Sequence, residues 1–194
     1  ENKPYLKEFS CEGCGVCELI CPKKAIKPIE IKNAKLGYAK TKYGFTVVSA
    51  QLGIGESGSG KVVSAVKKKA MGLAKAAEIL LVDSAAGIGC PVIASVVGSD
   101  YVIAVTEPTP SGFEDMKRAL KMVDHFKITH GIIINRYDIN PKKTEEIEKF
   151  AKENNIKILA KIPYDKNFVN ALVNLKPIIV YDKKYEPVFE KIAE

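Results

Sequence analysis

Residues 101–135, YVIAVTEPTPSGFEDMKRALKMVDHFKITHGIIIN, contain the pattern that decides the fold. The stretch begins with an apolar run at 101–106, continues with an amphipathic segment of helix length at 111–126 and ends with a second apolar run at 131–135. Short Val- and Ile-rich runs that alternate with such segments are typical of parallel strands joined by helices on both faces of the sheet. The sequence therefore predicts an α/β fold with a doubly wound, mostly parallel sheet.

The same alternation continues on both sides of this stretch. It predicts, in chain order, a strand at 45–52, a helix at 60–77, a strand at 79–83, a helix at 141–154 and a strand at 156–162. Ser111 is the expected N-cap of the helix that begins beside it. Asn140 is expected to cap the helix that begins at Pro141, because proline suits the first helical position.

A change of pattern divides the chain near residues 37–44. The residues before Phe45 are punctuated by Gly, Pro and Lys and lack helical or strand periodicity. We therefore predict a first segment of residues 1–44 and a main domain of residues 45–194. The chain opens at Glu1 without Met and enters a cysteine motif with no preceding strand, so we also expect an N-terminal truncation.

Four cysteines in the first segment form the most specific motif of the chain. Cys11, Cys14, Cys17 and Cys21, followed by Pro22, have the C-x-x-C-x-x-C-x-x-x-C-P spacing of bacterial ferredoxins, which bind a [4Fe–4S] cluster. The alternatives are a zinc knuckle and a disulfide pair. In two-cluster ferredoxins the last cysteine of a run ligates the other cluster. We therefore expect the first three thiolates to hold three corners of one cluster, with Cys21 directed toward another.

The charge and hydropathy of the chain limit its partners. No apolar run approaches the roughly 20 residues that span a bilayer, and no signal segment opens the chain, which predicts a soluble cytoplasmic protein without a membrane span. The net charge is +7, but Lys alternates with Glu along the predicted helices, so solvated helix surface, residues 67–69 included, is favoured over nucleic-acid binding. Residues 1–44 hold nine Lys and five Glu, a net +4, which suits an anionic cluster or an acidic redox partner.

A glycine-rich loop lies between the predicted strand 45–52 and the predicted helix 60–77. Its residues 55–61, GESGSGK, match G-x-x-x-x-G-K, the pattern of a phosphate-binding loop in which Lys61 would reach the phosphates. However, Val62 replaces the Ser or Thr that ligates Mg²⁺, and Glu56 adds a negative charge. The loop is therefore either a phosphate cradle or a glycine-rich turn from strand to helix.

Five segments together resemble MinD-superfamily P-loop ATPases that contain an inserted ferredoxin domain: GIGESGSGKVV (53–63), LVDSAAGIGCP (81–91), VTEPTPSG (105–112), INRYDIN (134–140) and IPYD (162–165). In that family a deviant Walker A, K-G-G-x-G-K-[ST], precedes two ferredoxin cysteine runs and the rest of the ATPase. This chain resembles the portion that begins at the second run. The resemblance implies that residues 55–61 are a separate segment, and that the chain lacks the first strand and the Walker A and is not active alone.

The resemblance also implies two residues near the phosphates. Asp83 ends the apolar run 79–83, in the Walker B arrangement in which a carboxylate orients Mg²⁺ and its water. Gly87 would lie in a switch loop, where its backbone can approach a γ-phosphate. The alternative for Asp83 is a cap in a strand-to-helix turn. Cys90, beside this loop, is expected to be a buried small residue.

The base-binding residues implied by the resemblance follow two predicted strands. Asn135 would hydrogen-bond adenine and Arg136 would stack on it, while Pro163 and Asp165 would complete the pocket. Turn and cap chemistry is the alternative for Asn135 and Asp165. Thr106, Glu107 and Pro108 form another loop at a strand end on the same side.

Two hypotheses for function follow from these motifs. The first is a switch that binds and hydrolyses ATP, forms a homodimer with nucleotide and couples this change to an iron–sulfur cluster that serves a redox or cluster-accepting partner. The alternative is an electron-transfer or iron–sulfur carrier whose ATPase body is a non-hydrolysing scaffold. A basic nucleic-acid binder ranks last, since it would need steeply salt-dependent affinity.

Overall fold

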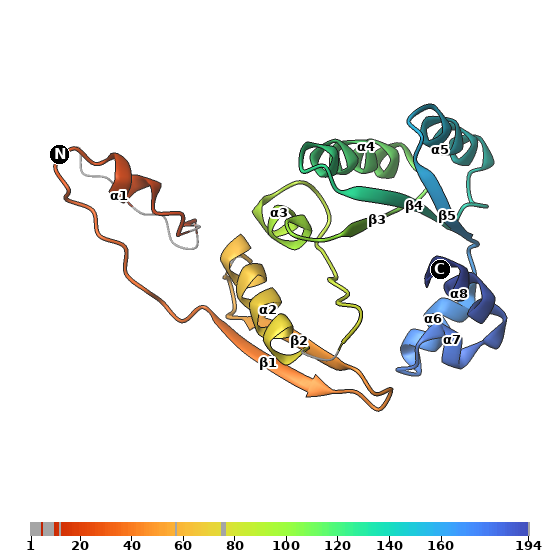
Figure 1. Cartoon of the computed structure of the whole chain (residues 1–194), viewed down its shortest axis with the longest axis horizontal. Coiled ribbons are helices and arrows are strands. Elements are labelled where there is room, and N and C mark those ends of the chain that lie inside the picture. The colour runs from red at the N-terminus through yellow and green to blue at the C-terminus, as the bar shows by residue number, and fades with distance from the viewer. Residues whose placement is uncertain (1–4, 6–9, 12, 57, 75–76, 194) are drawn as a thin grey trace. The chain divides into compact units, whose positions relative to one another are not determined.

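The computed structural model describes residues 5, 10, 11, 13–56, 58–74 and 77–193 of the 194-residue chain. The chain divides into two compact units, Glu1–Ser95 and Val96–Glu194. Figure 1 labels the α-helices and strands of both units. Among the described residues, no helix combines the length and the apolar character needed to cross a membrane.

The unit Val96–Glu194 is built on a parallel sheet. Its strands are β3 (Tyr101–Thr106), β4 (Thr129–Asn135) and β5 (Lys157–Ile162), hydrogen-bonded in the order β3-β4-β5. The central strand β4 contains the run Ile132, Ile133 and Ile134, and all three side chains are buried, as expected for a parallel sheet covered on both faces. The predicted strands at 101–106, 131–135 and 156–162 are confirmed.

Two capped helices connect these strands. In α4 (Pro110–His125), Thr109 is the N-cap, and its hydroxyl accepts a hydrogen bond from the Gly112 amide at 3.0 Å. The predicted cap Ser111 is wrong because Pro110 takes the first helical position and leaves the capping position to the residue before it. In α5 (Pro141–Glu153), Asn140 accepts from the Lys143 amide at 3.2 Å, as predicted.

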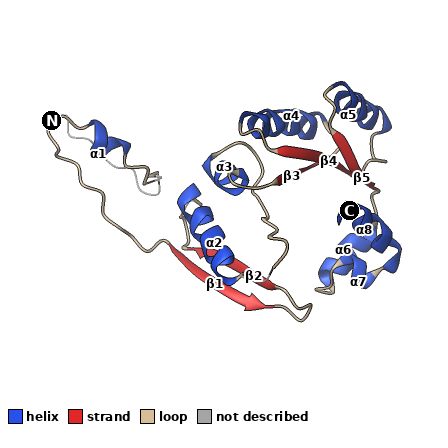
Figure 2. Cartoon of the chain, viewed as in Figure 1, coloured by secondary structure: helices blue, strands red, loops and turns tan. Residues whose placement is uncertain are grey.

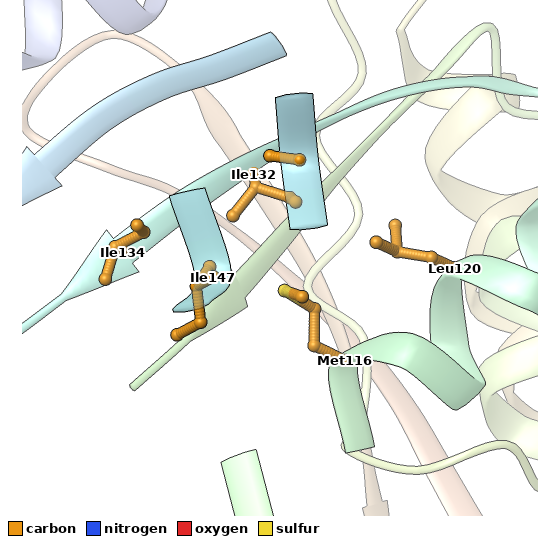
Figure 3. Packing of buried hydrophobic residues seen from close by; sticks show 6 residues of the cluster. Met116, Leu120, Ile132, Ile134 and Ile147 are labelled. Atoms are coloured by element: carbon orange, nitrogen blue, oxygen red, sulfur yellow. The ribbon is translucent and has the colours of Figure 1, made fainter. Parts of the chain in front are cut away.

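Apolar clusters cover both faces of the sheet at β4 and β5. After β5 the chain continues through α6 (Lys166–Val173), α7 (Ile178–Tyr181), the 3₁₀ helix η1 (Lys183–Tyr185) and α8 (Glu186–Ala193). On one face, a cluster shown in Figure 3 joins β4 to α4 and α5 and includes Met116, Leu120, Ile132, Ile134 and Ile147. On the other face, Ile133 and β5 pack against α6 and α8. The predicted doubly wound α/β fold is confirmed.

In its described residues, the unit Glu1–Ser95 contains a hairpin and three helices. Its elements are α1 (Val16–Ile20), β1 (Ala34–Lys40), β2 (Thr46–Leu52), α2 (Gly60–Leu73) and α3 (Cys90–Val96), the last of which reaches one residue beyond the unit. The predicted strand 45–52 forms as β2, but it pairs with β1 in an antiparallel hairpin instead of joining a parallel sheet (Figure 2). A short turn at residues 41–45 explains this pairing, because it returns the chain at once beside itself. The hairpin therefore includes residues 37–44, where the sequence pattern changes.

The predicted strand at 79–83 does not form. These residues are irregular, and Ile79 and Leu81 are 79% and 86% exposed. Among the described residues no strand pairs with this run. An apolar run becomes a strand only when a neighbour accepts its backbone hydrogen bonds, so the sequence pattern alone was insufficient here. The predicted helix 60–77 is shorter than expected, since α2 ends at Leu73, and residues 75–76 lie outside the described residues.

Candidate functional site

The carboxyl ends of β3, β4 and β5 lie at one edge of the sheet. Glu107 follows β3, Arg136 follows β4, and Tyr164 stands two residues beyond the end of β5. Open α/β sheets bind ligands outside the carboxyl ends of their strands, so this edge is the candidate ligand site of the unit. We refer to Glu107, Arg136 and Tyr164 as the strand-end cluster.

Arg136 is the centre of the strand-end cluster. Its backbone is left-handed, with φ of 52°. Its guanidinium Nη1 lies 3.2 Å from Glu107 Oε1, and its Cζ lies 5.9 Å from the centre of the Tyr164 ring. The Arg136 side chain is 47% exposed. A guanidinium that is fixed by a carboxylate and an aromatic face, yet open to solvent, is suited to stack on or hydrogen-bond a planar ligand.

The remaining loops at this edge are linked to each other. Asn135 is the last residue of β4 and is half-buried, as is Pro163, which follows β5. The Tyr164 amide donates to Asp138 Oδ1 at 2.7 Å, and this bond ties the loop after β5 to the loop after β4. Sequence reasoning missed Tyr164, although an aromatic residue just past a strand end is a usable signal. The structure thus brings Asn135, Arg136 and Pro163 to one edge, while their role toward adenine stays a prediction.

Asp165 acts as the N-cap of α6. Its Oδ1 accepts from the Asn167 amide at 2.7 Å, and its Oδ2 accepts from Lys184 Nζ at 2.6 Å and from the Tyr185 hydroxyl at 2.7 Å. The bond from Lys184, followed by those from Asn167 and Tyr185, lowers the pKa of Asp165 from its usual 3.8 to about 2. This carboxylate therefore joins α6 to η1, and contact with a base would compete with these bonds.

The depressed pKa of Asp165 predicts a pH-dependent contribution to stability. A carboxyl whose pKa is lower in the folded state stabilises the fold above its unfolded pKa, and this contribution is lost as pH falls through the folded pKa. We expect Asp165→Asn to lower Tm by about 3 °C at pH 6, and the difference from wild type to shrink between about pH 4 and pH 2. Thermal melts monitored by circular dichroism measure both effects. Asp115→Asn, at an exposed ion pair with Arg118 on α4, is the control, and an equal loss in both variants would contradict the assignment.

The cysteine run lies in the other unit and includes α1, with Cys21 at the C-cap of that helix. Cys11, Cys14 and Cys17 are exposed free thiols, and Cys21 is half-buried. The Ala25 amide donates to Cys21 Sγ at 3.3 Å. This bond is the largest influence on Cys21 and, with the amides of Lys23, Ile26 and Lys24, lowers its pKa despite some desolvation. Thiolates at this spacing, with an amide directed at a sulfur, are the donor set of an iron–sulfur cluster.

The four thiols are not yet gathered around a common point. Within the described residues, which include all four cysteines, no three His, Cys, Asp or Glu side chains lie close enough to hold one metal ion. The donor chemistry fits a cluster, and its binding would draw the exposed thiols together. Gly13 and Gly15 allow this, since both have left-handed backbones, with φ of 61° and 79°.

The glycine-rich loop contacts the cysteine run and α3. Lys61, in the first turn of α2, donates from Nζ to the Gly13 carbonyl at 2.6 Å. A Cβ at Gly60 would lie 3.0 Å from the Cys90 carbonyl oxygen, so glycine is needed where α2 and α3 approach each other. These contacts give the loop a packing role. A role of Lys61 toward phosphate stays a prediction.

The other predicted residues near the phosphates lie in the segment that precedes α3. Asp83 is exposed in the irregular run, and Gly87 has a left-handed backbone with φ of 98°. Cys90, expected to be buried, is exposed at the first position of α3. The prediction that residues 67–69 form solvated helix surface is wrong for Lys67, which is half-buried. Its Nζ donates to the Ala94 and Ser95 carbonyls at 3.2 and 2.8 Å. Burial lowers the pKa of Lys67.

Comparison with protein families gives two matches. The CobQ/CobB/MinD/ParA nucleotide binding domain matches residues 38–178, and the 4Fe-4S binding domain matches residues 4–27. The first covers most of the chain, including β3, β4 and β5, and the second covers the cysteine run.

Curated relatives come from Methanocaldococcus jannaschii. An uncharacterised protein is 34% identical over 185 residues, which are 93% of this chain and 61% of the relative. A second uncharacterised protein is 37% identical over 131 residues, 67% of this chain and 46% of that protein. An uncharacterised ATP-binding protein is 27% identical over 129 residues, 62% of this chain and 50% of the relative. The chain thus spans about half to three fifths of the length of these relatives.

Two solved structures have a similar fold. The cell division ATPase MinD of Pyrococcus furiosus matches with a TM-score of 0.56 and 20% identity, covering 72% of this chain and 58% of that one. The septum site-determining protein MinD of Pyrococcus horikoshii, solved in complex with Mg-ADP, has the same TM-score, identity and coverage of this chain, and 55% of its own chain is covered. At this identity the likeness shows the fold alone.

Proposed function

The chain belongs to the CobQ/CobB/MinD/ParA nucleotide-binding domain family, and on that premise we propose that it works in an ATP-dependent switch that acts on an iron–sulfur cluster. ATP binding and hydrolysis would change how the cluster-bearing segment meets a redox or cluster-accepting protein. In this proposal residues 1–44 are the cluster segment and residues 45–194 are the ATPase domain. The two segments follow each other in the sequence, and the pairing of β1 with β2 links them in the structure.

The observation that carries the nucleotide part is the strand-end cluster. Arg136, fixed by Glu107 and facing Tyr164, stands at the edge where sheets of this class bind ligands. In the proposal Arg136 stacks on adenine, Asn135 hydrogen-bonds the base, and Pro163 and Asp165 border it. The similar fold of a protein solved with Mg-ADP supports this choice of ligand class.

The hydrolytic part of the proposal depends on Asp83 and Gly87. Asp83 would orient Mg²⁺ and the attacking water, and the Gly87 backbone would approach the γ-phosphate. Their segment is irregular and exposed, so in this proposal it becomes ordered when nucleotide and Mg²⁺ bind. Order that depends on a γ-phosphate is a general way in which nucleotide switches change their surface.

The redox part of the proposal depends on the cysteine run. Cys11, Cys14 and Cys17 would hold one [4Fe–4S] cluster, which supplies one-electron chemistry or serves as cargo for a partner. The chain's own contribution would be to hold the thiolates and to direct a backbone amide at the sulfur of Cys21. An excess of positive charge in residues 1–44 suits an acidic partner surface.

The proposed switch predicts assembly that depends on nucleotide. We expect Mg-ATP to double the mass of the cluster-loaded chain to that of a homodimer. We also expect Mg-ATP to change by severalfold the rate at which the chain reduces an acceptor ferredoxin or transfers its cluster to that acceptor. Anaerobic light scattering and absorption spectroscopy measure these two quantities. Mg-ADP is the control. An unchanged mass together with an unchanged transfer rate would reject the switch.

One observation favours a second candidate function. Asp83 and Gly87 lie in an irregular exposed segment, whereas hydrolysis requires a fixed carboxylate. The second candidate is therefore an electron-transfer or iron–sulfur carrier whose ATPase body is a scaffold. It predicts that cluster transfer proceeds at the same rate with and without Mg-ATP, so the same experiment separates the two candidates.

A further inference from the structure

The contact between Lys61 and Gly13 gives the glycine-rich loop a connection to the cysteine run. The two residues are 48 positions apart, and Lys61 Nζ lies 2.6 Å from the Gly13 carbonyl oxygen. Gly13 directly precedes Cys14 in the cysteine run, and its backbone is left-handed. A lysine that satisfies the G-x-x-x-x-G-K pattern thus donates to the peptide backbone between two thiol ligands.

Lys61 stands on a helix that contacts α3 at its first residue and again near its middle. At its start, Gly60 allows α2 to approach the Cys90 carbonyl, where a Cβ would lie only 3.0 Å from the oxygen. Further along, Lys67 donates to the Ala94 and Ser95 carbonyls at 3.2 and 2.8 Å. Cations are favourable at the carbonyl end of a helix, so this contact stabilises the α2–α3 pair. The ammonium of Lys61 is therefore attached to a fixed support.

We propose that Lys61 is a positioning residue of the cysteine run, which holds the Gly13 carbonyl and keeps a positive charge beside the cluster bound by Cys11, Cys14 and Cys17. This inference rests on the proposed binding of that cluster. Once the bound cluster has drawn the thiols together, the bond from Lys61 to the Gly13 carbonyl limits their further movement and slows release of iron. A nearby positive charge favours the reduced cluster, which carries one more electron than the oxidised one, and so raises the reduction potential.

The matched variants are Lys61→Met, Lys61→Arg and Lys68→Met. Methionine keeps the length of the side chain without its charge, and arginine keeps the charge and can still donate to a carbonyl. Lys68 is exposed on the same helix, about 10 Å further along its axis, and serves as the charge control. Thermal melts of the iron-free chains check that each variant folds like the wild type.

The test begins with iron and acid-labile sulfide in the anaerobically reconstituted chains. Release of iron to a chelator and the midpoint potential, titrated with dithionite as the electron donor and followed by electron paramagnetic resonance, are then measured. We expect Lys61→Met to release iron about three- to tenfold faster than wild type and to have a lower potential, with Lys61→Arg and Lys68→Met near wild type.

Two results separate the inference from the proposed function. Wild-type release and potential in Lys61→Met, or equal changes in Lys61→Met and Lys68→Met, would overturn the positioning role while leaving cluster binding intact. A wild-type chain without iron and sulfide would reject the proposed function and the inference together. Loss of the cluster in Lys61→Met alone, with Lys61→Arg loaded, would support the positioning role in its strongest form.

Discussion

Replacing Cys14 with serine is expected to abolish cluster binding in the reconstituted chain. Wild type is expected to hold about four iron and four sulfide per chain, and Cys14→Ser is expected to hold less than about a tenth of that, because serine binds iron far more weakly than a thiolate does. Cys11→Ser and Cys17→Ser should behave in the same way. Iron and acid-labile sulfide assays measure the loss.

Two other cysteines define the limits of this prediction. Cys90→Ser makes the same chemical change at an exposed thiol outside the run, and we expect it to retain the cluster. Cys21→Ser is also expected to retain it, since the last cysteine of such a run ligates another cluster in two-cluster ferredoxins. Equal loss in Cys21→Ser and Cys14→Ser would instead make Cys21 the fourth ligand of one cluster. Zinc in place of iron would support the zinc alternative.

The central strand β4 could be predicted from the sequence because its middle residues are buried. Ile132, Ile133 and Ile134 form an apolar run that has one stable location, the middle of a sheet covered on both faces. The cap of α5 was equally predictable, since Asn140 followed by Pro141 is a local signal. At 79–83 the pattern was similar, but a strand also needs a neighbour, and that is a tertiary property.

The hairpin was missed because β1 has a weak pattern. Its residues 34–40 read AKLGYAK, in which Lys and Gly interrupt the apolar positions, and most of them are exposed. The usable signal in the sequence was Gly44, because a glycine readily adopts the left-handed backbone of a tight turn. In the structure Gly44 has φ of 92°, and in the same turn the Thr41 amide donates to the Phe45 carbonyl at 2.9 Å. A glycine immediately before a Val-rich run therefore indicated a return of the chain.

The sequence predicted where the candidate site lies in the fold, but it did not predict which side chains contact each other there. That Arg136 follows a strand end is clear from the sequence, and the expected edge of the sheet is where it lies. Its ion pair with Glu107 and its position over Tyr164 join residues from three loops, and no spacing rule predicts such contacts. Likewise, the G-x-x-x-x-G-K pattern identified Lys61 but gave no indication of its bond to Gly13, 48 residues away.

Arg136→Ala is expected to weaken nucleotide binding by about tenfold or more, which corresponds to about 1.4 kcal/mol. The change removes the guanidinium that the strand-end cluster holds open to solvent, and it leaves Glu107 without its cation. The matched control is Arg118→Ala on α4, which breaks a similar exposed ion pair, with Asp115, away from the strand ends. Lys61→Ala is the second comparison, because Lys61 is bonded to Gly13.

Calorimetric titration of Mg-ATP into the anaerobically purified chain tests whether the strand-end cluster binds the nucleotide. We expect wild type, Arg118→Ala and Lys61→Ala to bind Mg-ATP alike and Arg136→Ala to bind it at least about tenfold more weakly. If Lys61→Ala abolishes binding while Arg136→Ala leaves it unchanged, residues 55–61 are a phosphate-binding loop, and the assignment of the strand-end cluster to the nucleotide is wrong.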